Sequence, residues 1–276
     1  MKIVYYAGFS NKQRSDDTEG HIAHSLEKLG HEVECVQEGS SGYFSGDLFL
    51  FHKAPIEDLK KVVFNGPKVC WYFDKVWDKR VKWMKDALEW ADKIYITDGG
   101  WVKNNPNEKF EILYQGIGDD LSKGVRRDFE GKIVFTGEVY GERYEFVQLL
   151  NAIYESDFKV YCRAFNQVLR DLCVSIPIFV APKFPSDDHY WSSRVYQTIG
   201  SGGFLIHPYC SDLAKEYEDG KEIVYYRNND ELKEKIDYYL AHPEERERIR
   251  MAGYEKTIKN YTYTQRIKQL CSPFSK

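Results

Sequence analysis

The chain has 276 residues, of which 42% are hydrophobic and 30% charged, and its formal net charge is −4. This length is enough for two domains that each bury a core, and no segment approaches the roughly 20 apolar residues that span a bilayer. Basic residues form only local clusters, so the sequence lacks the basic stripe that strong non-specific nucleic-acid binding requires. These features predict a soluble globular protein.

The N-terminal stretch and the cysteines indicate an intracellular location. The first residues, MKIVYYAGFS, lack the charged region, long apolar stretch and cleavage site of a secretory signal. The six cysteines include no Cys-x-x-Cys pair, and most lie in apolar runs. We therefore expect reduced core thiols and a cytoplasmic protein.

Short apolar runs alternate with segments of helical period along most of the chain, which is typical of parallel strands joined by helices. In the first half, we predict strands at 3–6, 32–36, 47–51, 68–73, 93–97 and 110–113, with helices at about 19–29 and from 56. In the second half, we predict strands at 132–136, 158–161, 176–181, 203–207 and 222–226, with helices at about 143–154, 193–200 and 212–218. From 230 the pattern is helical, and it ends in a helix at 264–270.

The segment 115–131, QGIGDDLSKGVRRDFEG, is rich in glycine and charge and lacks periodic hydrophobicity, so it is predicted to be an interdomain linker. The sequence thus predicts an α/β protein with two Rossmann-like parallel-sheet domains facing a cleft. The first covers 1–120 and the second 131–262, and the helix within 263–276 packs back on the first.

Ligands of open parallel sheets bind beyond the carboxyl ends of the strands, where helix N-termini attract anions. Gly137 and Arg143 follow the predicted strand at 132–136, and Arg163 follows the strand at 158–161. A guanidinium beside a helix start can bind a diphosphate. The alternative for Arg143 is a surface ion pair with Glu142 or Glu145.

The strongest segment is APKFPSDDHYWSSRVYQTIGSGGFLIHP, at 181–208. Ser192 or Ser193 is predicted to cap a helix that begins near Arg194, and Gly200 to Gly203 end it. A loop that leads into a capped helix start is a backbone anion site.

The motif SSRVYQTIGSGGFLI at 192–206 is followed by Leu213, DGKE at 219–222, YY at 225–226, DEL at 230–232 and HPEER at 242–246. This ordered pattern resembles the C-terminal half of group 1 glycosyltransferases, particularly the spore-maturation-type branch, over roughly 131–270. The resemblance implies a GT-B fold, with an acceptor-side domain at 1–120 and a nucleotide-sugar domain at 131–262. It also implies a hexosyl- or pentosyltransferase that uses a nucleotide-diphosphate sugar, UDP-sugar first, with retention at the sugar carbon.

Two positions depart from the family pattern. The family helix carries a glutamate that holds the donor ribose, usually eight residues after an acidic residue that contacts the sugar, whereas this chain has Gln197 and His189. Gln can still hydrogen-bond a ribose hydroxyl. His189 cannot replace an acidic acceptor unless Asp187 or Asp188 takes that role.

In the first domain, Gly8 follows the first strand, His21 lies at a helix start, and Asp74 follows the strand at 68–73. Related enzymes contact donor or acceptor near the first loop, so His21 is a candidate sugar-facing group; a solvated helix-end histidine is the alternative. Asp74 is a candidate acceptor base, with loop capping as the alternative.

Other chemistries lose support from the motifs that the sequence lacks. It contains no Asp-x-Asp triplet, no metal-ligand spacing, no phosphate-binding GxxxxGK[ST] loop and no GxGxxG after the first strand. We expect no metal and no cofactor beyond the donor sugar.

The acceptor is open. The chain is similar in compactness to tailed-phage transferases, some of which glycosylate hydroxymethylated DNA bases, so such DNA is one candidate acceptor and the host cytoplasm the corresponding location. The stretch 71–85, WYFDKVWDKRVKWMK, suits a nucleic-acid face, although Trp77, Val81, Met84 and Leu88 also have the spacing of a helix core face. A non-catalytic nucleotide-sugar binding module and a GT-B-fold epimerase are the other hypotheses.

Overall fold

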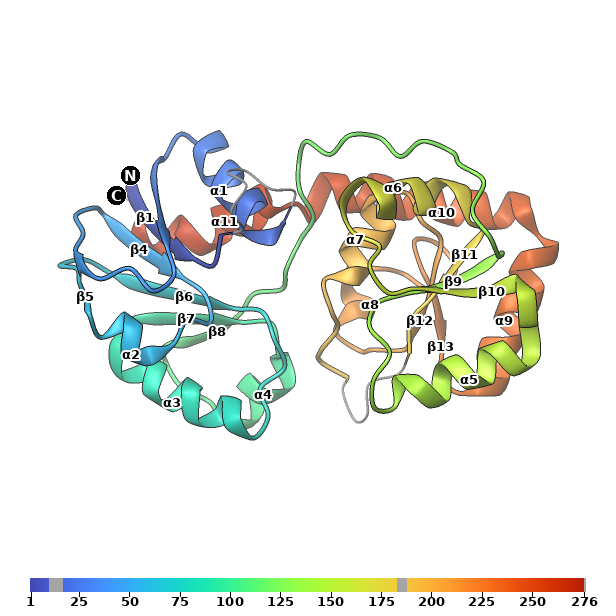
Figure 1. The fold of residues 1–276 in the computed structure, drawn as a ribbon, viewed down its shortest axis with the longest axis horizontal. Coiled ribbons are helices and arrows are strands. Elements are labelled where there is room, and N and C mark those ends of the chain that lie inside the picture. Colours follow the sequence, from blue (N-terminus) through green and yellow to red (C-terminus); the bar gives the residue numbers. More distant parts are fainter. Residues whose placement is uncertain (10–16, 183–187, 276) are drawn as a thin grey trace. The chain divides into compact units, whose positions relative to one another are not determined.

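The computed structural model describes residues 1–9, 17–182 and 188–275, and the chain divides into two compact units (Figure 1). Unit 1 contains Met1–Asp119 and Tyr261–Lys276, and unit 2 contains Asp120–Asn260.

Unit 1 is built on a six-stranded parallel sheet with the order β2-β1-β4-β6-β7-β8. Its strands are β1 (Lys2–Ala7), β2 (Glu32–Gln37), β4 (Leu48–Phe51), β6 (Lys68–Tyr72), β7 (Lys93–Ile96) and β8 (Phe110–Ile112). The short strands β3 (Gly42–Tyr43) and β5 (Val62–Val63) form a separate parallel pair. The central strands β1, β4, β6 and β7 are buried on both faces, which explains why they read as continuous apolar runs, whereas only Val36 is buried in the edge strand β2.

Helices cover both faces of this sheet (Figure 1). They are α1 (Thr18–Lys28), α2 (Ile56–Leu59), α3 (Lys79–Trp90), α4 (Gly99–Asn104) and α11 (Tyr263–Cys271), which is followed by a short 3₁₀ turn at Ser272–Phe274. Asp17 caps α1 by accepting a hydrogen bond from the amide of Gly20. The C-terminal helix α11 packs with α1 because Ile267 and Leu270 bury their side chains in the core that also contains Ile22 and Leu26.

Unit 2 is built on a five-stranded parallel sheet with the order β10-β9-β11-β12-β13. The strands are β9 (Ile133–Thr136), β10 (Phe158–Tyr161), β11 (Ile178–Val180), β12 (Leu205–Pro208) and β13 (Val224–Tyr226). The helices are α5 (Arg143–Tyr154), α6 (Asn166–Ser175), α7 (Arg194–Gly200), α8 (Leu213–Glu216), α9 (Asn229–Ala241) and α10 (Pro243–Asn260), with a 3₁₀ turn at Glu155–Asp157. Apolar residues of α5 and α9, such as Leu150 and Ile236, join the sheet in one core.

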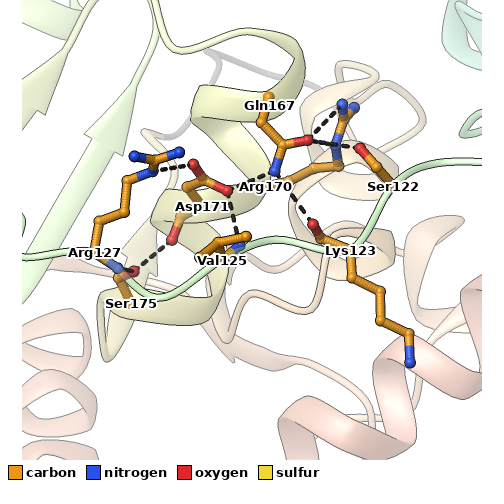
Figure 2. A network of polar contacts seen from close by, with 8 residues as sticks. All are labelled: Ser122, Lys123, Val125, Arg127, Gln167, Arg170, Asp171 and Ser175. Atoms are coloured by element: carbon orange, nitrogen blue, oxygen red, sulfur yellow. Dashed lines mark hydrogen bonds and ion pairs between the residues drawn. The ribbon is translucent and has the colours of Figure 1, made fainter.

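The segment that connects the sheets is bound to unit 2 through α6 (Figure 2). The Asp171 carboxylate accepts hydrogen bonds from the Val125 amide at 2.8 Å and from the Gln167 amide group at 2.6 Å, and it pairs with Arg127. The Arg127 amide donates to the Ser175 hydroxyl at 2.9 Å. A stretch that reads as a linker from composition is therefore held to α6 over residues 122–127.

The sequence interpretation missed α6 and misplaced Trp77. The α6 segment, NQVLRDLCVS, carries polar groups that bond to one another and to the connecting segment, so its pattern alone does not indicate a buried helix. Trp77 precedes α3 and is 50% exposed, whereas Met84 and Ala87 of α3 are buried. Trp77 is therefore not part of the helix core face.

Candidate functional site

The carboxyl edge of the unit 2 sheet brings together most of the residues predicted from the sequence. The strand order reverses around β9, because β10 follows on one side and β11 on the other. Loops that leave such a switch point in opposite directions open a crevice in which ligands bind. Arg143 follows β9, and Ser192 and Arg194 follow β11, so these side chains belong to the two loops that flank this point.

Arg143 begins α5 and is buried, with 8% of its surface exposed. Its Nη1 donates to the Glu138 carbonyl at 3.0 Å, and its guanidinium lies 4.3 Å from the centre of the Tyr140 ring. These contacts fix the guanidinium at the start of the helix, where the helix dipole also favours an anion.

Arg194 begins α7 and reaches back across the sheet edge to β9. Its Nη1 donates to the Thr136 carbonyl at 3.3 Å and its Nε to the Ser192 hydroxyl at 3.4 Å. Burial, and then the nearby positive charge of Arg143, lower the pKa of Arg194. Among the described residues no carboxylate pairs with Arg194.

Gly137 is required by this arrangement. Its φ is +136°, a conformation that favours glycine. A Cβ at this position would also collide with Nη1 of Arg194. The glycine therefore makes room for the guanidinium at the end of β9.

Both arginines line a cavity of about 30 Å³ in unit 2. Its other polar walls come from Thr136, Ser192, Thr198 and His207. A space of this size holds one or two water molecules, so it can receive part of a phosphate group but not a whole nucleotide sugar. The nucleoside and the sugar would have to lie outside it.

The predicted serine cap of α7 is wrong. Ser193 occupies the N-cap position but its side chain makes no capping hydrogen bond, and its backbone is already in the helical region. The Ser192 hydroxyl instead accepts from Arg194. The polar contact at the start of α7 is thus made by the Arg194 side chain rather than by a serine cap.

His189 lies in the loop before α7, and Asp212 holds its ring. Nδ1 of His189 is 2.8 Å from Oδ2 of Asp212, whose other oxygen is 2.6 Å from Nζ of Lys215. Asp212 is buried, with 6% exposed. The carboxylate beside His189 is therefore that of Asp212. The backbone carbonyl of Asp188 accepts hydrogen bonds from the Asp212 amide and the Ser211 hydroxyl. Asp187 lies outside the described residues.

Gln197 and Arg163 complete the predicted donor residues of unit 2. Gln197 lies on α7, three residues after Arg194, and is half-buried. Arg163 lies in the turn after β10 and is exposed. Both are at the same edge of the sheet as the cavity, but neither lines it.

In unit 1, Asp74 and Gly8 lie at the carboxyl edge of the sheet. Oδ2 of Asp74 is 2.6 Å from Nζ of Lys53 and 2.8 Å from Nη1 of Arg80. Asp74 therefore joins the loop after β4 to α3 by ion pairs. Gly8 is exposed, and a Cβ there would come within 3.3 Å of the Glu38 carboxylate.

His21 lies on α1, inside unit 1. Its ring stacks on Tyr263 of α11 with the centroids 6.2 Å apart, and it packs so closely on Gly118 that a Cβ there would collide with it. These contacts give His21 a packing role between α1, α11 and the chain segment after β8.

His207 and Asp212 were not recognised from the sequence. The sequence predicts His207 only as the end of a strand. A polar residue that ends an apolar run at a carboxyl edge is, however, the same pattern that identifies the other candidates. Asp212 was read as the start of a helix. Its pairing with His189 is a contact between two loops, and no local pattern indicates it.

The described residues contain neither a candidate metal site nor a candidate membrane span. Within residues 1–9, 17–182 and 188–275, no group of three or more His, Cys, Asp or Glu side chains is arranged to hold a metal ion. No helix of these ranges is both long and apolar enough to cross a membrane.

A family described as glycosyl transferase-like matches residues 122–272. This match covers the whole carboxyl edge of unit 2 described above, including both arginines and His207. A comparison with curated proteins finds no match.

Solved structures of similar fold cover nearly the whole chain. Sucrose-phosphate synthase from Thermosynechococcus elongatus has a TM-score of 0.71 at 10% identity and 99% coverage of each chain. Anabaena HepE in complex with UDP-glucose has a TM-score of 0.65, with the same identity and coverage. A T4 phage BGT mutant in complex with UDP-glucose has a TM-score of 0.62 at 12% identity, with both chains covered completely. At such identities the similarity concerns the fold, and it confirms the predicted GT-B type with its parallel sheets.

Proposed function

Because the chain belongs to the glycosyl transferase-like family, we propose that it transfers a sugar from a nucleotide-diphosphate donor to a hydroxyl acceptor. A UDP-sugar is the favoured donor, and HepE and the T4 phage BGT mutant, which share the fold, were crystallised with UDP-glucose. The motif at 192–206 supports membership of the spore-maturation-type branch. No cofactor besides the donor is required.

The observation that carries this proposal is the pair Arg143 and Arg194 in one cavity at the switch point of unit 2. The two guanidiniums repel each other, and an anion between them removes this cost. Donors fixed before the reaction stabilise the charge that develops on the leaving diphosphate as the sugar–phosphate bond breaks. Ser192 and the amides near it add hydrogen-bond donors at the same place.

The sugar and ribose ends of the donor lie beside this cavity in the proposal. Gln197 binds a ribose hydroxyl, Arg163 adds charge near the nucleotide, and His189, oriented by Asp212, contacts the sugar. Family resemblance supports retention at the sugar carbon, with the leaving phosphate helping to deprotonate the acceptor, so that no protein nucleophile is needed. The sugar is a hexose or a pentose.

The acceptor is a hydroxyl group that unit 1 would select. Hydroxymethylated bases of phage DNA are one candidate, supported by the compactness of the chain and by the exposed Trp77 in the basic stretch 71–85. A gel shift with hydroxymethylated duplex DNA at low salt tests this candidate. Absence of any complex removes it without affecting the donor assignment.

The donor assignment is tested by calorimetry with UDP. Arg194→Ala should weaken UDP binding by about 100-fold, because a buried charge-assisted contact is lost. Arg248→Ala, which removes an arginine that is 59% exposed on α10, is the matched control and should leave the affinity unchanged. Equal affinities for the two variants would refute the assignment.

Incubation with a panel of nucleotide sugars, read by mass spectrometry, separates the remaining functions. Release of free sugar and nucleotide in the absence of acceptor indicates a transferase and excludes a binding module. A nucleotide sugar of altered stereochemistry, with no transfer, indicates an epimerase.

A further inference from the structure

His207 is a titratable wall of the arginine cavity whose chemistry the donor assignment leaves unused. It lies at the carboxyl end of β12, next to Tyr225 of β13 in the sheet register, and it is buried, with 9% exposed. It lines the same cavity as Arg143, Arg194 and Ser192.

The hydrogen bonds of His207 fix which nitrogen carries its proton. Nδ1 is 2.7 Å from the Pro208 carbonyl oxygen, which can only accept, so Nδ1 carries the hydrogen. Nε2 of the neutral ring therefore presents a lone pair. Among the described residues, Nε2 has no hydrogen-bond partner.

The surroundings keep this ring neutral as long as no anion is bound. Burial, together with the positive charge of Arg194, lowers the pKa of His207 to about 4, although the hydrogen bond to the Pro208 carbonyl raises it. Arg194 in turn faces Arg143, Tyr140 and Tyr190. The Tyr225 hydroxyl donates elsewhere, to the Tyr217 carbonyl at 3.1 Å, and the β11 side of His207 is apolar.

A neutral His207 does not suit a diphosphate. Phosphate oxygens accept hydrogen bonds, and so does the Nε2 lone pair, so the two would repel each other in a cavity this small. Protonation at Nε2 turns the repulsion into a charge-assisted hydrogen bond. The negative charge of the ligand also offsets the effect of Arg194, which favours the protonated ring.

We propose that His207 takes up one proton when a phosphate group of the donor reaches into the arginine cavity, and then serves through Nε2 as its third cationic hydrogen-bond donor beside Arg143 and Arg194. This inference rests on the proposed function, because it assumes a diphosphate between Arg143 and Arg194. Donor affinity then depends on pH through a group of the protein.

The test is calorimetry of UDP-glucose binding near pH 6.5, in two buffers of different ionisation enthalpy. UDP-glucose is the probe because its diphosphate is esterified at both ends and does not titrate in this range, unlike the terminal phosphate of UDP. The difference in observed enthalpy gives the number of protons taken up. We expect close to one, and a dissociation constant that rises about tenfold for each pH unit between the pKa of the free state and that of the bound state, and levels off above the latter.

Two variants assign the proton. His207→Asn keeps a donor near the position of Nδ1, and His207→Gln places an amide near the position of Nε2; both should bind without proton uptake and with an affinity that is flat between about pH 6 and pH 8. His242→Gln, which removes an exposed histidine of unit 2 that does not line the cavity, is the matched control and should retain the uptake. Thermal unfolding checks that each variant is folded. If one His207 variant does not fold, the other still provides the test.

The outcomes separate this inference from the function on which it rests. Binding that depends on Arg194 but shows no proton uptake in the wild-type protein overturns the role of His207 and leaves the donor site intact. Uptake that persists in both His207 variants also overturns it. UDP-glucose binding that is insensitive to Arg194→Ala refutes the donor site itself.

Discussion

The carboxyl edges of the two sheets differ in what holds their charged side chains. In unit 1, Asp74 is bound by Lys53 and Arg80, and the ring of His21 is packed against Tyr263 and Gly118. In unit 2, Arg143 and Arg194 lie in one cavity, and no carboxylate pairs with Arg194 among the described residues. Position at a strand end is common to both edges, but Asp74 is neutralised by two cations, whereas Arg194 has no carboxylate partner among the described residues.

Position at the end of a strand identifies a candidate residue, and the contacts of its side chain decide whether that side chain is available to bind a ligand. An ion pair at the surface stabilises the loop that carries it. Two cations in one cavity destabilise each other. Groups perturbed in this way are frequent at sites where a ligand supplies the opposite charge. The following changes test the comparison in order of expected effect.

The largest effect is expected from Gly137→Ala. The added Cβ meets the Arg194 guanidinium at a φ of +136°, so it should displace the arginine, weaken UDP binding by at least about tenfold and destabilise unit 2 by about 1–3 kcal/mol. Gly141→Ala is the matched control, because its φ is +53° and nothing lies within 4 Å of the added Cβ; it should cost about 1 kcal/mol. Calorimetry and thermal unfolding measure both, and equal UDP affinity in the two variants would contradict the fit of Gly137 to Arg194.

A smaller effect is expected when the contacts between α6 and the connecting segment are weakened. Helix α6 packs on α7, which carries Arg194. The Val125 amide, then Arg127 and Gln167, lower the pKa of Asp171 to about 2 (Figure 2). A carboxylate with a lowered pKa stabilises the fold fully above its ordinary pKa near 4, and this contribution is lost as the pH falls through about 2. Asp171→Asn should therefore lower the melting temperature at pH 6 and make it less sensitive to acid between pH 4 and pH 2.

The control for this acid dependence is Asp157→Asn, because the carboxylate of Asp157 forms an exposed ion pair with Lys132. That variant should keep the wild-type slope of melting temperature against pH. Hydrogen exchange locates the change: protection should fall in α6 and the connecting segment of Asp171→Asn and stay constant in α1 and α11. Loss of protection in α1 instead would show that the segment does not act through unit 2.

The order of most strands and helices could be predicted from the sequence because the central strands of both sheets are buried on both faces and form continuous apolar runs. Residues that touch the cavity from local motifs, such as Gly137, Arg143 and Arg194, were also found. The pairing of His189 with Asp212 joins residues 23 positions apart, and the bonds of Asp171 to Val125 and Arg127 join a polar helix to an apparent linker. Such contacts leave no local period, so only the structure reveals them.

The smallest effect is expected at Asp74, where the two interpretations of the sequence differ most. A general base that is removed costs about 10²–10⁴ in rate, whereas an exposed ion pair contributes about 1 kcal/mol or less to stability. Lys53 and Arg80 both bind the same carboxylate oxygen of Asp74, which fits the ion-pair role, so Asp74→Asn should change the rate of transfer less than about threefold and lower the melting temperature slightly. The measurement is the rate constant of sugar transfer with donor at saturation, once the nucleotide-sugar panel has identified a reactive pair. A loss of 100-fold or more, with donor affinity unchanged, would restore Asp74 as the acceptor base and show that ion pairs at the unit 1 edge open when substrate binds.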